Sequence, residues 1–75
     1  MGRFVLSQRD LIRILQAHGF TQTHQRGSHQ YWERPGYKVT VDVKYREYSG
    51  WLLREMISQS GLPKAVFRAR EALRG

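Results

Sequence analysis

The alternation in residues 37–43, YKVTVDV, limits the possible folds of this 75-residue chain more than any other stretch. Apolar and polar side chains change places at every position, which is the pattern of a strand with one buried and one solvated face. The preceding Pro35 and Gly36 are a strong turn signal. We therefore expect a sheet that is covered on one side only. Its apolar face would carry Tyr37, Val39, Val41 and Val43, and its polar face Lys38, Thr40 and Asp42.

Two further β-prone segments precede this strand. Residues 20–25, FTQTHQ, carry no helical periodicity, and residues 29–34, HQYWER, end at the Pro-Gly turn. Gly27 and Ser28 lie between these two segments, as the short turn of a hairpin would. The simplest interpretation is a three-stranded antiparallel sheet with tight turns.

The segment before the sheet has helical periodicity. Residues 7–10, Ser-Gln-Arg-Asp, form a capping box in which Asp10 would reach back to the start of the helix. Gly19 suits the position after a helix end because it adopts a positive φ at no steric cost. A first helix is therefore predicted over about residues 7–18, with an apolar stripe of Leu11, Ile12, Ile14 and Leu15.

The segment after the sheet also has helical periodicity. A charged, aromatic loop is expected over residues 44–49, followed by a helix over about residues 50–60 that Gly61 ends, with Trp51 packed at its start. Pro63 suits the first turn of a further helix, which would continue with Val66, Phe67, Arg70 and Leu73. The apolar stripe of the middle helix consists of Leu52, Leu53, Met56 and Ile57.

The predicted fold is thus α+β, with the order α-β-β-β-α, the helices on one face of the sheet, and an extra C-terminal helix. Residues 1–75 are expected to form a single domain, with a core over 7–62 and a helical extension over 63–75. No apolar run approaches the length of about 18 residues that a membrane span needs, and the N-terminus is too short in its apolar part for a secretory signal, so a cytoplasmic location is the default.

Charge is the most informative property of the composition. Thirteen Lys and Arg residues against six Asp and Glu residues give a net charge of +7. The basic residues are scattered over the chain, so the folded surface itself should attract polyanions, nucleic acid above all. The chain contains no cysteine, which excludes disulfides and thiolate zinc sites.

The ordered set SQRDLIRILQAHGF, QRGSHQYW, PGYKVTVDV and LLREMISQSGL resembles the HicA toxins of bacterial and archaeal toxin–antitoxin systems. The resemblance covers about residues 7–62. It implies a small RNA endonuclease with a fold like that of double-stranded-RNA-binding domains, neutralised by a HicB antitoxin that covers the active site. The catalytic histidine of the family falls on His29. Many relatives carry His-Gly-x-Lys-Glu where this chain has residues 44–47, Lys-Tyr-Arg-Glu.

The residues around His29 suit the cleavage of mRNA without a metal or another cofactor. The 2′-hydroxyl of RNA attacks the adjacent phosphorus if a base takes its proton, and histidine suits either proton role because its ordinary pKa is about 6.5. Gly27 lets a phosphate approach the backbone, and Ser28 adds a hydroxyl and an amide. The cations expected to contact RNA are Arg26, Arg34, Lys38 and Lys44.

Several alternatives stay open at this level. Gly27 and Ser28 can be a plain turn, and the whole chain can be a non-catalytic RNA-binding module of the same fold. His24 is either a second proton carrier or an ordinary surface residue, whereas His18 is expected to have a structural role at a helix end. Because the family counterpart of Tyr31 is usually apolar, we assign Tyr31 to the core and Trp32 to the open face, where it would stack on a base or contact the antitoxin. Whether His29 acts as acid or base, the cleavage preference and the oligomeric state are not predicted.

Overall fold

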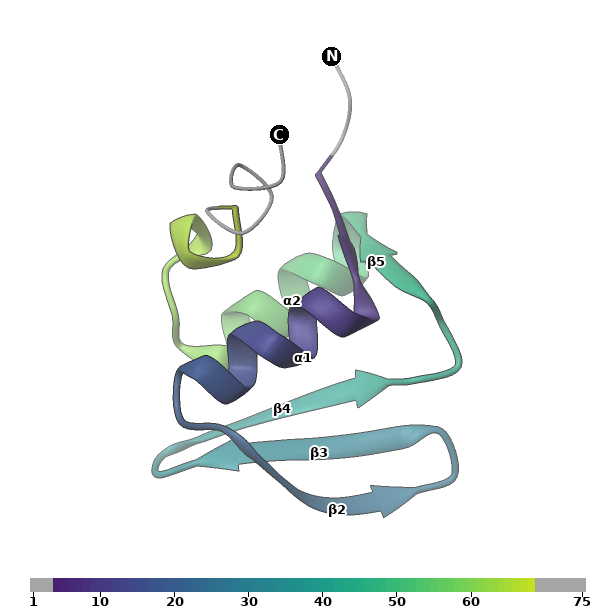
Figure 1. Cartoon of the computed structure of the whole chain (residues 1–75), viewed down its shortest axis with the longest axis vertical. Helices are drawn as coiled ribbons and strands as arrows, with labels where there is room; N and C mark the ends of the chain where they lie inside the picture. Colours follow the sequence, from purple (N-terminus) through teal and green to yellow (C-terminus); the bar gives the residue numbers. More distant parts are fainter. Residues whose placement is uncertain (1–3, 69–75) are drawn as a thin grey trace.

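A three-stranded antiparallel sheet with two helices on one side of it forms the main body of the protein (Figure 1). The computed structural model describes residues 4–68. The α+β prediction and the α-β-β-β-α order are confirmed. The elements are β1 (Val5–Ser7), α1 (Gln8–Ala17), β2 (Thr21–Arg26), β3 (His29–Arg34), β4 (Tyr37–Asp42), β5 (Glu47–Ser49) and α2 (Gly50–Ser60).

The larger sheet has the order β2-β3-β4, and two short turns connect its strands. Gly27 has a φ of 58° and Gly36 a φ of 86°, a backbone region that glycine adopts most easily. The β3–β4 hairpin pairs Arg34 with Tyr37 at the turn, and the pairing continues without a shift to His29 opposite Asp42. The β2–β3 hairpin has an irregularity between Gln22 and His24, where β2 contains one extra residue.

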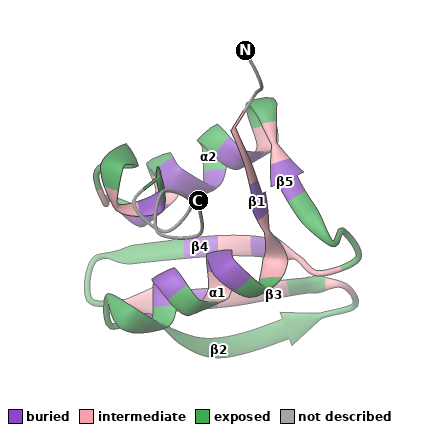
Figure 2. Cartoon of the chain, turned by 45° about the horizontal axis from the view of Figure 1, so that its top comes forward, coloured by how far each residue is buried: buried purple, intermediate pink, exposed green. Residues whose placement is uncertain are grey.

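The core lies between the helices and the inner face of the large sheet (Figure 2). The apolar stripes predicted for both helices are confirmed, with Ile12 and Leu52 only partly buried. Ser7 caps α1 as expected, because its Oγ accepts a hydrogen bond of 3.0 Å from the Asp10 amide. The fully or almost fully buried apolar side chains include Leu6, Leu11, Leu15, Phe20, Val39, Val41, Leu53, Met56 and Phe67.

Part of the expected loop over residues 44–49 is a strand. Glu47–Ser49 forms β5 and pairs with β1, with Leu6 opposite Tyr48. β1 leads directly into α1 and β5 into α2, so this small sheet joins the starts of the two helices. The prediction missed it because each strand has only three residues and its partner lies about forty positions away in the chain, which leaves no local pattern.

Three aromatic residues correct the sequence interpretation. Trp32 is only 5% exposed and belongs to the core, because it pairs with the fully buried Val39 and paired residues share a face. Tyr31, opposite Thr40, therefore lies on the open face and not in the core. Trp51 is 68% exposed and does not pack, since it lies on the side of α2 opposite Leu53.

A further helix follows Pro63, as expected, and is described over residues 64–68. Phe67 is fully buried and Val66 packs against the core at its edge. Arg70 and Leu73, which were expected to belong to this helix, lie outside the described residues. Over residues 4–68, no helix combines the length and the apolar character that crossing a membrane requires.

Gly61 should be the least replaceable of the turn glycines. Its φ is 70°, and a Cβ atom there would lie 2.7 Å from both Cδ1 and Cζ of Tyr37. Gly36 has a φ of 86°, but nothing lies within 4 Å of a Cβ at that position. We expect Gly36→Ala to destabilise by roughly 1–2 kcal/mol from backbone strain alone, and Gly61→Ala to destabilise by about 1 kcal/mol more.

Thermal unfolding of both variants tests this, because each kcal/mol shifts Tm by roughly 4–8 °C in a domain of this size. In a Tyr37→Ala background the two substitutions should cost the same. Equal losses of Tm in the presence of Tyr37 would show that its ring does not restrict this position.

Candidate active site

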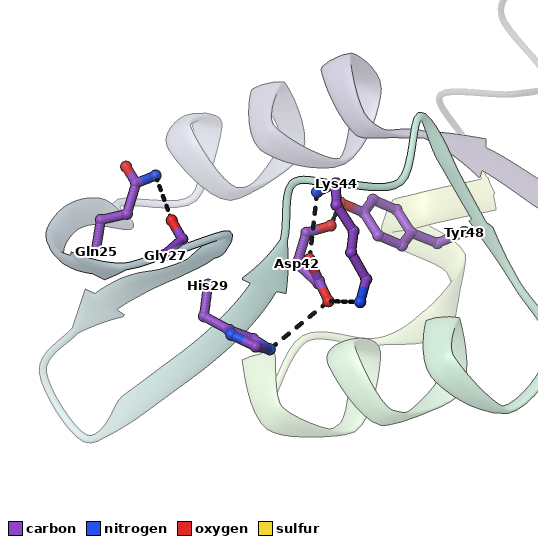
Figure 3. A network of polar contacts seen from close by, with 6 residues as sticks. All are labelled: Gln25, Gly27, His29, Asp42, Lys44 and Tyr48. Atoms are coloured by element: carbon purple, nitrogen blue, oxygen red, sulfur yellow. Dashed lines mark hydrogen bonds and ion pairs between the residues drawn. The ribbon is translucent and has the colours of Figure 1, made fainter.

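His29 begins β3 directly after the turn at Gly27 and Ser28, and its imidazole is 51% exposed. No atom lies within 4 Å of a Cβ built on Gly27, so the backbone beside His29 is open to an approaching group. The Gly27 carbonyl accepts a hydrogen bond of 2.9 Å from Nε2 of Gln25 (Figure 3). The sequence interpretation of this segment as a turn and the start of a strand is confirmed.

An aspartate faces His29 from the neighbouring strand. Oδ2 of Asp42 lies 3.6 Å from Nε2 of His29 and 3.7 Å from Nζ of Lys44. Oδ1 accepts a hydrogen bond of 3.2 Å from the Lys44 amide (Figure 3). The Asp42 side chain is only 14% exposed, whereas the imidazole and the ammonium group beside it are open to solvent. The Asp42 carboxylate is thus fixed behind two exposed groups, the His29 imidazole and the Lys44 ammonium group.

The surroundings of Asp42 favour its ionised form. Burial alone would raise the pKa of Asp42, but hydrogen bonds from the Ser28 side chain and the Lys44 amide, together with the charges of Lys44 and His29, lower this pKa below 3.8. A carboxylate with a depressed pKa stabilises the fold above its unfolded pKa, and this contribution disappears only as the pH falls through the folded value. Asp42 is therefore ionised throughout the neutral range.

Two residues outside the site hold this arrangement in place. Tyr48 is buried, and its hydroxyl donates a hydrogen bond of 2.7 Å to the Asp42 carbonyl. Burial and the charge of Asp42 raise the pKa of this phenol, although a hydrogen bond with Gln8 opposes them. Nε2 of Gln8 donates to the carbonyls of Val43 and Tyr45 at 2.9 and 2.8 Å. The segment that carries Lys44 is thus fastened to the first turn of α1.

Two of the expected cations lie on the same open face as His29. Arg26 pairs with His29 across β2 and β3, and Lys38 lies on β4, with its Nζ 5.3 Å from the centre of the Tyr31 ring. A pocket of about 430 Å³ is hollowed into this face. Its lining consists of Thr23, His24, Arg26, Tyr31, Glu33 and Lys38.

Two expected RNA contacts are not brought to this face. Trp32 is buried beneath the sheet, as described above. The Arg34 guanidinium lies over the rings of Phe20 and Tyr37, at 5.2 and 4.6 Å from their centres, and donates a hydrogen bond of 3.5 Å to the Ser60 carbonyl. Arg34 points to the helix side because it shares the inner face of β3 with Trp32. The structure therefore gives neither residue a place beside His29.

The other two histidines lie apart from this cluster. His18 caps the end of α1, with Nδ1 at 2.9 Å from the Ile14 carbonyl, in agreement with the structural role expected for it. His24 lies opposite Tyr31, with 6.0 Å between the ring centres, and lines the pocket. Among residues 4–68, no three side chains of the metal-binding types come close enough together to hold an ion.

Asp42 is the site residue that the sequence interpretation missed. It was assigned only to the polar face of the strand. The signal was nevertheless present, because counting outward from the turn at Pro35 and Gly36 pairs residue 34 with 37 and residue 29 with 42. The same count would have placed Trp32 opposite Val39 and therefore in the core.

Comparison with models of protein families identifies the family of this chain. The model of the family described as HicA toxin of bacterial toxin–antitoxin systems matches residues 8–62, from the start of α1 to just past the end of α2. This range includes His29, Asp42 and Lys44. Among curated proteins, none is similar enough to the chain to count as a match. Because the family match spans well over half of the 75 residues, the chain belongs to the HicA family and is a toxin of a bacterial toxin–antitoxin system.

Proposed function

We propose that this toxin is a metal-independent endonuclease that cleaves mRNA, with His29 as the residue that transfers a proton. The observation that carries the proposal is the pairing of an exposed imidazole with an ionised aspartate, 3.6 Å apart, on a face that also carries cations. For folding alone, an exposed imidazole gains little from such a partner. An imidazole held by a carboxylate is, by contrast, a recurrent arrangement in proton-transfer chemistry.

The proposed reaction needs three functions from the protein. The 2′-hydroxyl of RNA forms a bond to the adjacent phosphorus while its proton goes to a base, and the bond from phosphorus to the 5′-oxygen breaks while that oxygen receives a proton. His29 serves one of these two proton transfers. Lys44 and Arg26 donate to the non-bridging oxygens, on which negative charge accumulates in the transition state.

Asp42 is a positioning residue in this mechanism. Its carboxylate, held by Lys44 and the strand end, fixes the orientation of the imidazole and favours the imidazolium that forms when His29 takes up a proton. It does not itself contact the RNA, because the more exposed groups of His29 and Lys44 lie in front of it.

The family assignment implies an antitoxin partner. We propose that an acidic, HicB-like protein covers the face that carries His29. This face is accessible in the toxin, and the net charge of +7 provides a strong attraction for an acidic surface. Covering His29 would exclude RNA directly, so neutralisation would need no change in the toxin fold.

Replacing His29 by alanine should lower the rate of RNA cleavage by roughly 10² to 10⁴, because the proton-transfer step loses its carrier. Cleavage by the wild-type protein should persist in EDTA. The variant should still melt cooperatively and bind RNA, since an exposed residue at a hairpin edge contributes little to folding. His18→Gln is the control, as it alters a histidine at the far end of α1.

A parallel assay of Asp42→Asn separates positioning from binding. We expect kcat to fall by less than in His29→Ala while KM changes little, with Glu55→Gln on the exposed side of α2 as the control for the lost charge. Wild-type cleavage rates in folded His29→Ala would show that the imidazole is not the proton carrier. No cleavage by the wild-type protein would favour the non-catalytic RNA-binding module.

Arg26 and Lys38 should each contribute one phosphate contact. In the non-cleaving His29→Ala background, replacing either by alanine should weaken binding to single-stranded RNA and reduce the slope of log K against log salt by roughly 0.7. Arg34→Met should leave the slope unchanged, because that guanidinium packs against Phe20 and Tyr37. A slope that responds to Arg34 and not to Arg26 or Lys38 would place the RNA on the other side of the sheet.

A further inference from the structure

The pocket on the open face lies next to His29 but contains none of the groups that surround Asp42. Its lining residues come from all three strands of the large sheet, and Tyr31 lines it from the middle strand, β3. We propose that this pocket holds one unpaired nucleotide of single-stranded RNA, with its base stacked against Tyr31, immediately beside the phosphate that is cleaved. The inference rests on the proposed RNA endonuclease function and identifies where the toxin binds its substrate.

Aromatic surface is the first reason for this proposal. Tyr31 lies on the middle strand, and the His24 ring faces it from β2 with 6.0 Å between the centres and a tilt of 40°. Aromatic and imidazole rings are the groups on which proteins stack unpaired bases, whereas Trp32, the other aromatic residue of β3, is buried in the core. Tyr31 thus takes the stacking role that the sequence interpretation had given to Trp32.

The charges around Tyr31 indicate how the nucleotide is oriented in the pocket. Arg26 lies at the end of the sheet near His29, opposite that histidine in the pairing of β2 and β3. Glu33 lies towards the other end of β3, where it accepts a hydrogen bond from Thr23 Oγ1. The Arg26 end attracts a phosphate more strongly, because at the other end the carboxylate of Glu33 offsets the charge of Lys38 opposite it. The phosphate should therefore lie towards His29 and the base should extend over Tyr31 towards Glu33.

Lys38 can serve the same nucleotide. Its ammonium group lies 5.3 Å from the centre of the Tyr31 ring in the free protein. Lys38 lies opposite Glu33, at the end of the pocket away from His29. Because its side chain is flexible, it can leave the ring when a base occupies the pocket and meet the phosphate on the other side of that nucleotide. The pocket then contains two permanent cations, Arg26 and Lys38, against the single carboxylate of Glu33.

The spacing along β3 fits one nucleotide. His29 and Tyr31 are two residues apart on the same face, which is a distance of about 6.8 Å in an antiparallel strand. A paired duplex would hide the faces of its bases inside the helix stack, so a base can reach Tyr31 only from a single strand, a loop or an unpaired end. The pocket therefore selects unpaired RNA.

Binding of fluorescent single-stranded RNA to the His29→Ala protein tests the proposal without cleavage. Tyr31→Leu should raise Kd by roughly 5- to 150-fold, the equivalent of 1–3 kcal/mol for one stacked base. Tyr31→Phe should bind like its parent, since the ring is kept. Trp51→Leu is the control, because it removes an exposed aromatic residue on the helix side of the molecule. Thermal melts confirm that each variant is folded.

An unchanged Kd for folded Tyr31→Leu, or a Kd that rises equally in Tyr31→Phe, would overturn the stacking site. So would tighter binding of a fully paired RNA duplex, or no binding of single-stranded RNA by the parent at low salt. Because all of these measurements use the His29→Ala background, failure of the stacking site leaves the role of His29 in cleavage unaffected. If the prediction for cleavage by His29 fails instead, the binding measurements can still be interpreted.

Discussion

The tight turn at Pro35 and Gly36 determines which residues of β3 and β4 face one another, and with them the two sides of the molecule. The pairing runs without a shift from this turn to the other end of the hairpin, where His29 meets Asp42. A slip by one residue would send every side chain of β3 to the opposite face, so Trp32 would leave the core and His29 would lose its partner. The geometry of the turn and the burial of Trp32 against Val39 therefore favour the same register, and this register creates the site.

The small β1–β5 sheet connects this site to the rest of the fold. It holds the starts of α1 and α2 together. Gln8 of α1 donates hydrogen bonds to the carbonyls of Val43 and Tyr45, and Tyr48 of β5 donates one to the Asp42 carbonyl. Asp42 and Lys44 therefore depend on the packing of both helices, although neither lies in a helix. The exposed part of the site, His29 and its turn, is held by the pairing of β3 with both β2 and β4 and by a hydrogen bond of 2.8 Å from the Val43 amide to the Ser28 carbonyl. A rigid carboxylate behind an accessible imidazole is the outcome.

The sequence predicted the elements with a strong local pattern and failed where the decisive contact was distant. Both helices and β4 follow from periodicity and end signals. The role of His29 comes from the resemblance to the family and stays a prediction. β5 has only three residues, and its partner β1 lies about forty positions earlier in the chain. Tyr31 and Trp32 are adjacent aromatic residues, so their residue types alone did not reveal which one is buried. Counting from the turn would have done so, and would also have placed Asp42 beside His29.

The central claim is that His29 assists attack by the 2′-hydroxyl of the RNA itself. The most direct test is an RNA in which the single nucleotide before the cleaved phosphate is replaced by its 2′-deoxy form, with the products of the unmodified RNA identified by mass spectrometry. We expect the deoxy substitution to abolish cleavage at that phosphate, and the unmodified RNA to yield a 2′,3′-cyclic phosphate and a 5′-hydroxyl. Cleavage of the deoxy RNA at the unmodified rate, or products with a 5′-phosphate, would contradict this chemistry.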